Sequence, residues 1–305
     1  MHDDCADALR YSVPDEVPDT TAGENRGGVD QRAESPHGVP PYRGTRSPIV
    51  SAVAGLSISS AAATAIIEPD VGGRVSSLRV NGTEVIAGPD DGRGEFDWGI
   101  YPMAPFAGRL RDGRIRYKGT VRQLPLNAAP HAMHGFVHSN EWRIHDKTES
   151  SITLRCELGD PWPWRGNLFH IISMHDWKIR MELSFTAKHE QPMMLGWHPW
   201  FARPCSFTTE FGTMYERGDD GIPTGRLVRP RTNDVDDCFA DPLDDPTVTV
   251  GDTRMKLFSN CSHWVVYDRA GHGVCIEPQS GRTCATARTR WCRTASATTR
   301  STATA

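Results

Sequence analysis

The sequence predicts an all-β protein, a large antiparallel β-sandwich built from many short strands. From Ile49 onward, short apolar runs are separated by glycine, proline and asparagine, which favour turns. Residues 178–185 alternate polar and apolar side chains over eight positions, as a strand with one solvated and one buried face does. No stretch has the apolar period of a long amphipathic helix. These three observations favour strands throughout the folded part of the chain.

Each expected strand is an apolar run bounded by turn residues. In chain order these runs are 56–67, 74–80, 84–87, 114–117, 152–156, 169–174, 178–185, 248–250, 255–258, 264–267 and 273–276. Asn81-Gly82, Lys118-Gly119 and His175-Asp176 supply three of the turns. The strands place one folded domain at residues 49–281.

The two ends of the chain differ from this domain. Residues 1–48 hold nine acidic and five basic side chains and six prolines, without apolar periodicity, so we expect a disordered extension. In residues 282–305, arginine, threonine and alanine make up 19 of 24 positions, with no acidic residue. We expect this tail to form no strand and to be disordered.

Composition excludes several classes of partner. The net charge is −4, from 34 basic and 38 acidic residues, so no basic field indicates nucleic acid. No apolar run reaches the roughly 20 residues that a membrane span needs, and the first residues do not read as a leader. The eight cysteines are scattered without a CxxC pair, as reduced thiols are. We expect a cytoplasmic protein, monomeric or weakly dimeric, that binds a small molecule.

Two residues are candidates for proton transfer. His198 lies in Gly-Trp-His-Pro-Trp-Phe (196–201), where aromatic neighbours and a proline constrain the imidazole. Both a proton donor and a core histidine with one hydrogen bond fit that setting. Glu277 ends an apolar strand before Pro278, and partial burial there would raise its pKa towards the range of a general base. A structural ion pair with an arginine is the alternative.

Two further segments carry charge at constrained places. Arg109 follows a proline-stiffened apolar run, where its planar fork could face neighbouring oxygens or form a structural ion pair. Asp234, Asp236 and Asp237 set three carboxylates beside Phe239, a pattern that is also common in solvated turns.

Three histidines, His131, His134 and His138, follow one another at spacings of three and four. On a helix this spacing would suit a metal ion. Pro130 and Gly135 indicate a loop or strand instead, where the imidazoles diverge. We therefore expect no metal here.

The chain resembles a known family, the aldose 1-epimerases or galactose mutarotases. Six segments carry the resemblance in the family's order: Pro-Phe-Ala-Gly-Arg-Leu-Arg-Asp-Gly-Arg (105–114), Gln-Leu-Pro-Leu-Asn (123–127), His-Ala-Met-His-Gly-Phe (131–136), Gly-Trp-His-Pro-Trp-Phe (196–201), Asp-Asp-Cys-Phe (236–239) and Ile-Glu-Pro-Gln-Ser-Gly (276–281). The Gly-Trp-His-Pro form is most similar to bacterial, especially actinobacterial, members. The resemblance implies the same β-sandwich that the strand pattern predicts.

The resemblance also implies catalytic roles. Glu277 corresponds to the general base that takes the proton from the anomeric hydroxyl of a sugar. His198 corresponds to the general acid that protonates the ring oxygen. Such a reaction needs no metal and no cofactor.

Sugar-binding roles follow by the same correspondence. Arg109, His134 and Asp236 match residues that bind sugar hydroxyls, and Asp237 could exchange roles with Asp236, since spacing alone does not fix which carboxylate points inward. Four tryptophans could supply stacking faces for a sugar or pack in the sandwich: Trp162, Trp164, Trp197 and Trp200.

The implied activity is the interconversion of α and β anomers of a free aldohexose such as galactose or glucose. A hexose 6-phosphate is an alternative substrate, for which Arg111, Arg114 and Arg165 offer cationic groups. A homologue that binds sugar with impaired turnover is a third possibility.

The resemblance stops at Gly281. Family members continue there with Pro-Pro-Asp-Ala and a closing strand. We interpret residues 282–305 as an aberrant tail, from a frame-shifted reading of a GC-rich gene. A missing last strand would leave a neighbouring edge unpaired, so we expect impaired folding or activity.

Overall fold

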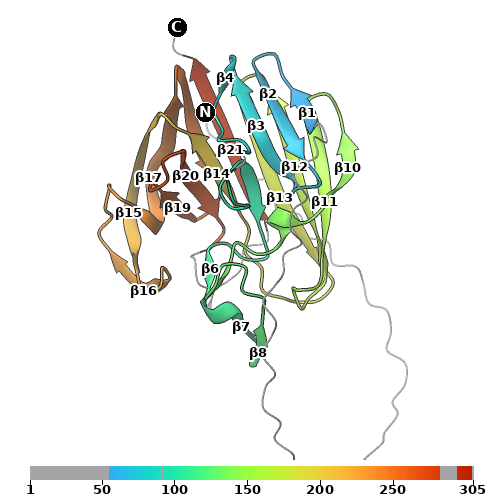
Figure 1. The fold of residues 1–305 in the computed structure, drawn as a ribbon, viewed down its shortest axis with the longest axis vertical. Helices are drawn as coiled ribbons and strands as arrows, with labels where there is room; N and C mark the ends of the chain where they lie inside the picture. Colours follow the sequence, from blue (N-terminus) through green and yellow to red (C-terminus); the bar gives the residue numbers. More distant parts are fainter. Residues whose placement is uncertain (1–54, 91, 282–293, 304–305) are drawn as a thin grey trace, which may run out of the picture. The chain divides into compact units, whose positions relative to one another are not determined.

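The computed structural model describes residues 55–90, 92–281 and the backbone of 294–303, which together form an antiparallel all-β sandwich (Figure 1). This confirms the predicted fold class. Two short 3-10 turns, η1 (Arg111–Gly113) and η2 (Val137–Ser139), interrupt the strands. None of the helical turns in the described part of the chain is long or apolar enough to cross a membrane.

Twenty-one strands are present in the described residues. The first ten are β1 (Leu56–Ser59), β2 (Ala63–Glu68), β3 (Arg74–Val80), β4 (Thr83–Glu84), β5 (Ile100–Met103), β6 (Arg109–Leu110), β7 (Arg114–Tyr117), β8 (Thr120–Gln123), β9 (Ala132–Met133) and β10 (Arg143–Lys147). The others are β11 (Ser151–Leu158), β12 (Gly166–His175), β13 (Lys178–Ala187), β14 (Gly196–Ala202), β15 (Cys205–Arg217), β16 (Pro223–Val228), β17 (Asp236–Val250), β18 (Thr253–Ser259), β19 (His263–Tyr267), β20 (Gly273–Gln279) and β21 (Thr294–Ala303).

Seventeen of these strands are joined in one hydrogen-bonded sheet, and every strand ladder is antiparallel. One arm runs from β10 through β11 and β12 to β13, each strand pairing with the next along the chain. The other arm contains β5, β14, β20, β19 and β17 side by side. Two small ladders, β6–β9 and β7–β8, lie outside this sheet.

Local patterns predicted several strands well. Strands β3 and β7 have the predicted bounds, and the alternating run at 178–185 lies in β13. The expected strand 56–67 is instead the hairpin β1–β2, because the small residues Ser60–Ala62 turn the chain and Ser60 N–H donates to the Ala63 carbonyl (2.8 Å).

Strand β17 is the largest departure from the expected bounds. It begins at Asp236 rather than at 248, because residues 241–246, which contain two prolines and three aspartates, run along β15 with shifts in register instead of forming a turn. Strands β14, β15 and β16 were not predicted as strands.

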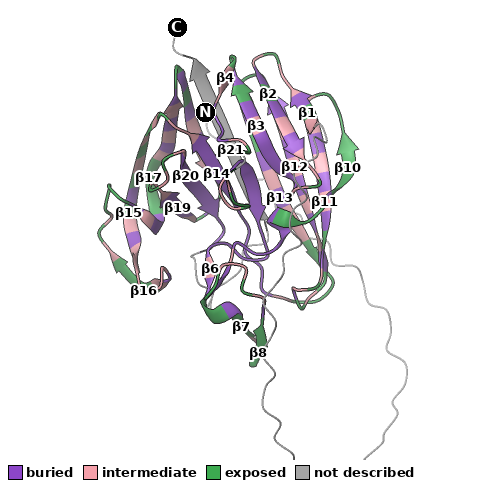
Figure 2. Cartoon of the chain, in the orientation of Figure 1, coloured by how far each residue is buried: buried purple, intermediate pink, exposed green. Residues whose placement is uncertain are grey.

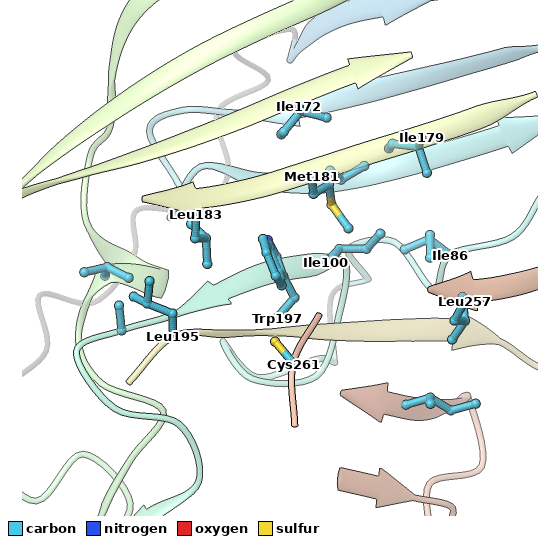
Figure 3. Close-up of a cluster of buried hydrophobic side chains, with 14 of the residues drawn as sticks. Ile86, Ile100, Ile172, Ile179, Met181, Leu183, Leu195, Trp197, Leu257 and Cys261 are labelled. Atoms are coloured by element: carbon cyan, nitrogen blue, oxygen red, sulfur yellow. The ribbon is translucent and has the colours of Figure 1, made fainter. Parts of the chain in front are cut away.

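The core fills the space between the arms. Strand β20 is buried at every residue, whereas β10 is exposed at every residue (Figure 2). Figure 3 shows Trp197 of β14 among Met181 and Leu183 of β13 and Ile100 of β5. Contacts between strands far apart in the sequence thus hold β14 in place.

The expectation that the C-terminal tail forms no strand is wrong for residues 294–303. Strand β21 pairs with β13 on one side and with β18 on the other. The edges of β13 and β18 pair with its backbone, and threonine favours the extended conformation. The composition of the segment alone does not indicate this pairing. The expected disorder of residues 1–48 and 282–293 lies outside the described residues.

Candidate active site

Strand register brings the two candidate proton-transfer residues together. Trp200 of β14 lies opposite Cys275 of β20, and residues opposite one another in an antiparallel pair share a face of the sheet. His198 is two positions before Trp200, and Glu277 is two positions after Cys275, so both side chains lie on that same face next to one another. In the Gly-Trp-His-Pro motif, Trp197 therefore packs in the main core, and His198 lies on the opposite face of β14.

This face opens into a cavity of about 180 Å³. That volume suits a small polar molecule, since one water occupies about 30 Å³ of the liquid. The side chains and backbone around it come from eight strands and the loops beside them: Phe96, Asp97, Gly108, Arg109, Met133, His134, His198, Trp200, Tyr215, Arg217, Gly221, Pro223, Asp236, Asp237, Cys238, Val265, Tyr267 and Glu277.

His198 and Glu277 are in direct contact at the cavity wall. Nε2 of His198 lies 3.3 Å from Oε1 of Glu277, and both residues are buried. The other polar atom of each, Nδ1 of His198 and Oε2 of Glu277, has no hydrogen-bond partner among the described residues. A buried atom without a partner is unusual and leaves capacity for a bound molecule.

Burial opposes the charged form of both groups. Desolvation raises the pKa of Glu277 well above its ordinary value; nearby Asp236 adds to this, while Arg109 opposes it. Desolvation lowers the pKa of His198 to about 3, and the positive charge of Arg74 acts in the same direction. The pair therefore favours a neutral carboxyl group and a neutral imidazole.

The loop before η2 fixes the imidazole of His134 beside this pair. The Gly108 N–H donates to Nδ1 of His134 (3.2 Å), and the His134 N–H donates to the Gly108 carbonyl (2.9 Å). In neutral His134 the proton is therefore on Nε2. Gly135 has φ 71°, and a Cβ there would lie 1.8 Å from the Ala104 carbonyl oxygen, so only glycine fits after His134.

The two candidate aspartates face opposite ways. Asp236 lies opposite Tyr267, whose neighbour across β19–β20 is Cys275, so Asp236 shares the face of Glu277. Asp237, the next residue, belongs to the other face, and its carboxylate pairs with Arg231 at 3.0 Å. Both aspartates line the cavity, and the register places the Asp236 side chain on the face that carries Glu277.

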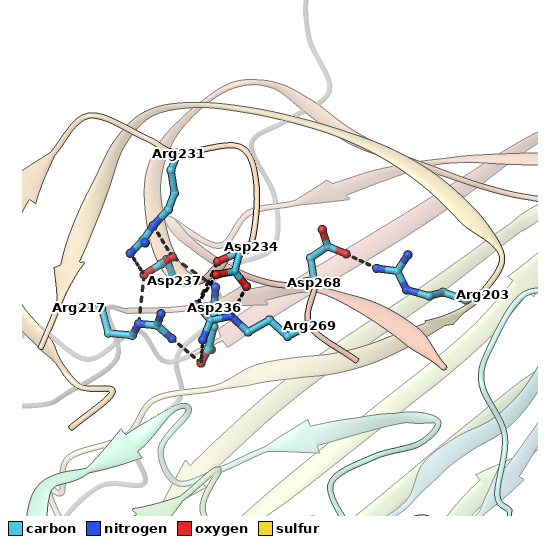
Figure 4. Close-up of polar contacts among 8 residues, drawn as sticks. All are labelled: Arg203, Arg217, Arg231, Asp234, Asp236, Asp237, Asp268 and Arg269. Atoms are coloured by element: carbon cyan, nitrogen blue, oxygen red, sulfur yellow. Dashed lines mark hydrogen bonds and ion pairs between the residues drawn. The ribbon is translucent and has the colours of Figure 1, made fainter. Parts of the chain in front are cut away.

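Arginines surround these carboxylates, as Figure 4 shows. Nη1 of Arg217 lies 2.7 Å from Oδ2 of Asp236, and its Nε lies 3.6 Å from Oδ1 of Asp237. Burial raises the pKa of Asp236 against the pull of Arg109 and Arg217. Arg109 lines the cavity near Gly221, with no carboxylate of the described residues within ion-pairing distance. Its fork is therefore available to a ligand.

A buried arginine, Arg74, holds backbone segments next to the site. Arg74 donates hydrogen bonds to the carbonyls of Val71, Glu95, Trp98 and His138, at 3.0–3.1 Å. Its guanidinium also lies 4.9 Å from the ring centre of Tyr101. Tyr101 in turn stacks on His198, with ring centres 4.8 Å apart.

Sequence reasoning missed several of these residues. Arg217 ends the alternating strand β15, and Cys275 is two positions before Glu277, so strand alternation around the named candidates would have indicated both. Nothing local marks Arg74 or Tyr101, because their roles depend on contacts between distant segments.

Other candidates lie away from the cavity or serve the core. Of the four candidate tryptophans, all in the described residues, Trp200 alone lines the cavity; Trp162 and Trp197 are core residues, and Trp164 packs against Trp162. Arg111 is paired with Asp220.

The remaining arginines and histidines can be placed in the same way. Arg114 hydrogen-bonds Gln123, and Arg165 is not among the lining residues. Nδ1 of His131 accepts the Asp112 N–H, and His138 is buried against Phe96. In the described part of the chain, the histidines at 131–138 form no metal-ligand cluster; the one such cluster is His198, Cys275 and Glu277.

Comparisons with known proteins agree with the fold. A family model described as "Aldose 1-epimerase" matches residues 56–280. An uncharacterised Escherichia coli K12 protein, YihR, is 25% identical over 114 residues, which is 35% of this chain and 36% of that protein.

Three solved structures share the fold. A candidate aldose 1-epimerase of E. coli K12 has a TM-score of 0.73 at 14% identity, covering 82% of this chain and 99% of that one. The GalM/aldose epimerase homologue of C. elegans has a TM-score of 0.69 at 13% identity, covering 82% and 98%. The galactose 1-epimerase of Lactobacillus acidophilus NCFM has a TM-score of 0.67 at 13% identity, covering 81% and 93%.

Proposed function

Because this chain belongs to the aldose 1-epimerase family, we propose that it interconverts the α and β anomers of a free aldohexose such as glucose or galactose. The observation that carries the proposal is the contact of His198 with Glu277 at the cavity wall, 3.3 Å between Nε2 and Oε1. One carboxyl group and one imidazole that face the same cavity are the acid and the base that opening of a hemiacetal needs.

The proposed reaction starts from the carboxylate–imidazolium form of the pair, in which Glu277 removes the proton from the anomeric oxygen O1 while His198 delivers a proton to the ring oxygen O5. The C1–O5 bond breaks, and O1 becomes the oxygen of an aldehyde. The open chain rotates about C1–C2, and O5 attacks the other face of C1. His198 then takes back the O5 proton, and Glu277 returns a proton to O1.

The protonation of the pair suits a reaction that runs equally in both directions. A carboxylate with an imidazolium holds one proton and has no net charge, and so does a carboxylic acid with a neutral imidazole. Burial favours the second form, and Arg109 favours ionised Glu277. Either form offers one donor and one acceptor, which exchange roles between ring opening and ring closure.

Three groups near the pair are proposed to bind sugar hydroxyls. Nε2 of His134 is a donor, because its Nδ1 accepts the Gly108 N–H. Asp236 offers carboxylate oxygens on the cavity face, and Arg109 offers N–H groups beside it. Donors and acceptors on different sides of a small cavity fix the orientation of a polyol.

The positions of the other arginines support a free hexose rather than a hexose 6-phosphate. Arg111 is engaged by Asp220, and Arg114 by Gln123. Arg165 lies outside the lining of the cavity. Of the three residues considered for a phosphate, none faces the cavity with a free charge.

Polarimetry on the purified chain tests the proposal. Freshly dissolved α-glucose and α-galactose should approach their equilibrium rotation faster with the protein than with buffer alone. No acceleration of either sugar would overturn the proposal. Calorimetric binding of galactose without acceleration would identify the impaired sugar-binding homologue instead.

A further inference from the structure

Three donors of different chemistry meet beside the cavity. One ligand atom each of His198, Cys275 and Glu277 lies within 4.8 Å of the other two, and all three residues are buried. Strand register explains why the three residues meet. Cys275 and Glu277 are two positions apart on β20, so their side chains lie on the same face. Trp200 lies opposite Cys275, and His198, two positions before Trp200 on β14, therefore lies on that face too.

The cluster contains buried polar atoms without partners. Nδ1 of His198 and Oε2 of Glu277 have no hydrogen bond among the described residues. His198 and Glu277 line the cavity, so an ion that enters the cavity reaches them. Cys275 is not among the lining residues but lies on the same face of the sheet. A cation bound by Glu277 can take both carboxylate oxygens, and it would then satisfy Oε2, which the described residues leave without a partner.

We propose that His198, Cys275 and Glu277 form a binding site for Zn²⁺ or a similar borderline-soft divalent cation, and that the bound ion blocks proton transfer by the pair. Nitrogen, sulfur and oxygen donors together are the set that Zn²⁺ accepts. Mg²⁺ and Ca²⁺ require mostly oxygen, of which this cluster offers one side chain. The blocking effect rests on the proposed function, whereas the binding does not.

Charge balance favours the ion in this buried place. On binding, the Cys275 thiol and the Glu277 carboxyl group each release a proton to solvent, and the resulting thiolate and carboxylate bond to the metal. His198 contributes the lone pair of a ring nitrogen. Two anionic ligands offset the two charges of the ion, so no net charge is buried.

The distances require only a small contraction. Zinc bonds of about 2.0–2.3 Å in a tetrahedron separate the donor atoms by roughly 3.5 Å. Nε2 of His198 and Oε1 of Glu277 are already 3.3 Å apart, and no separation in the cluster exceeds 4.8 Å. Rotation of the Cys275 or Glu277 side chain supplies a change of that size.

The inhibition test uses the full chain after treatment with a chelator. Zn²⁺ should slow mutarotation of α-glucose by the wild-type protein at least tenfold, and Mg²⁺ should not. With each rate compared with that of the same protein without metal, Cys275→Ala should need at least about tenfold more Zn²⁺ for the same fractional inhibition, since even the loss of an outer-shell partner weakens metal sites by that factor. Cys156→Ala, at another buried cysteine, should behave like the wild type.

A second measurement does not depend on activity. Co²⁺ added to the wild type and to Cys156→Ala should produce a near-ultraviolet thiolate-to-cobalt absorption band, which Cys275→Ala and Cys275→Ser should lack while unfolding at the wild-type temperature. A wild type without this band, or a Cys275→Ala protein as sensitive to Zn²⁺ as the wild type, would overturn the site. A band without mutarotation would refute the proposed function and leave the metal site standing.

Discussion

Glu277 and His198 lie where burial opposes the charge of each, and the two groups are in contact. Neither group alone would be suited to proton transfer at neutral pH, because a strongly protonated carboxyl is a poor base and a strongly deprotonated imidazole is a poor acid. Together they hold one proton that can be on either partner. At this scale, we propose the pair rather than either residue as the functional unit.

The pH profile of activity follows from that pair. Between about pH 5 and pH 7 we expect kcat/KM for α-glucose to show no transition from His198, because burial lowers the pKa of that imidazole to about 3. An ordinary histidine would titrate near 6.5 within this range. Polarimetry at several pH values, with the buffer rate subtracted, checks this; a transition near 6.5 would contradict it.

The two neighbouring aspartates give a matched test of orientation. Asp236→Asn should raise KM about 10–100-fold, because a hydrogen bond to a charged group contributes about 1.5–3 kcal/mol. Asp237→Asn should leave KM unchanged and lower the free energy of unfolding by about 1–3 kcal/mol, since it removes the partner of Arg231. KM from polarimetry and denaturant titrations separate the two effects, and a KM effect confined to Asp237→Asn would reverse the assignment.

At the scale of elements, β14 divides its side chains between two tasks. Trp197 packs in the main core, while His198 and Trp200 face the site, where Trp200 belongs to a second buried cluster with Tyr101 and Cys275. Arg74 of β3 holds four backbone carbonyls of the segments beneath. The position of His198 therefore depends on several strands at once.

This dependence limits what the sequence could predict. The bounds of β3 and β7 follow from local alternation, and the candidates His198 and Glu277 follow from their motifs. Their contact depends on the register of β14 against β20, which no local pattern contains. For the same reason, the choice between Asp236 and Asp237 stayed open until the pairing of β17 with β19 was known.

His170 connects β12 to this core and makes stability depend on pH. Its Nδ1 donates to the Gly73 carbonyl (3.1 Å) and its Nε2 accepts the Trp197 Nε1–H (3.2 Å), which requires the neutral ring. Burial lowers its pKa to about 4. Between about pH 6.5 and 4 the unfolded chain therefore binds one more proton at this residue, so stability falls as pH falls.

The variant His170→Gln tests that dependence. The slope of unfolding free energy against pH should decrease by about one proton, or about 1.4 kcal/mol per pH unit, between pH 4.5 and 6. The exposed His175 offers a control, since His175→Gln should keep the wild-type slope. Denaturant titrations at several pH values give both slopes; equal slopes for His170→Gln and the wild type would refute the role of His170.

At the scale of the whole molecule, β21 joins the two arms of the sheet. Its ladder covers Lys178–Ser184 of β13 and Thr253–Ser259 of β18. Without it, two strand edges would be open to other chains. The strand thus takes the closing place in the sheet, although its composition suggested a tail.

Deletion of residues 294–305 should therefore destabilise the domain and cause association. We expect a lower thermal midpoint and early elution from a sizing column, because the exposed edges of β13 and β18 can pair between molecules. Deletion of residues 1–48, the predicted extension, is the control and should change neither quantity. A truncated chain as stable and as monomeric as the full chain would show that β21 does not close the sheet.

The central claim is that the contact of Glu277 with His198 transfers the protons of sugar-ring opening. The most direct test is the mutarotation rate of α-glucose and α-galactose with Glu277→Gln, which keeps the shape of the side chain but cannot take up a proton. We expect a loss of about 10²–10⁴ in kcat, the contribution of one general acid or base. The exposed control Glu157→Gln should be as active as the wild type. A Glu277→Gln protein with near wild-type kcat would contradict the account.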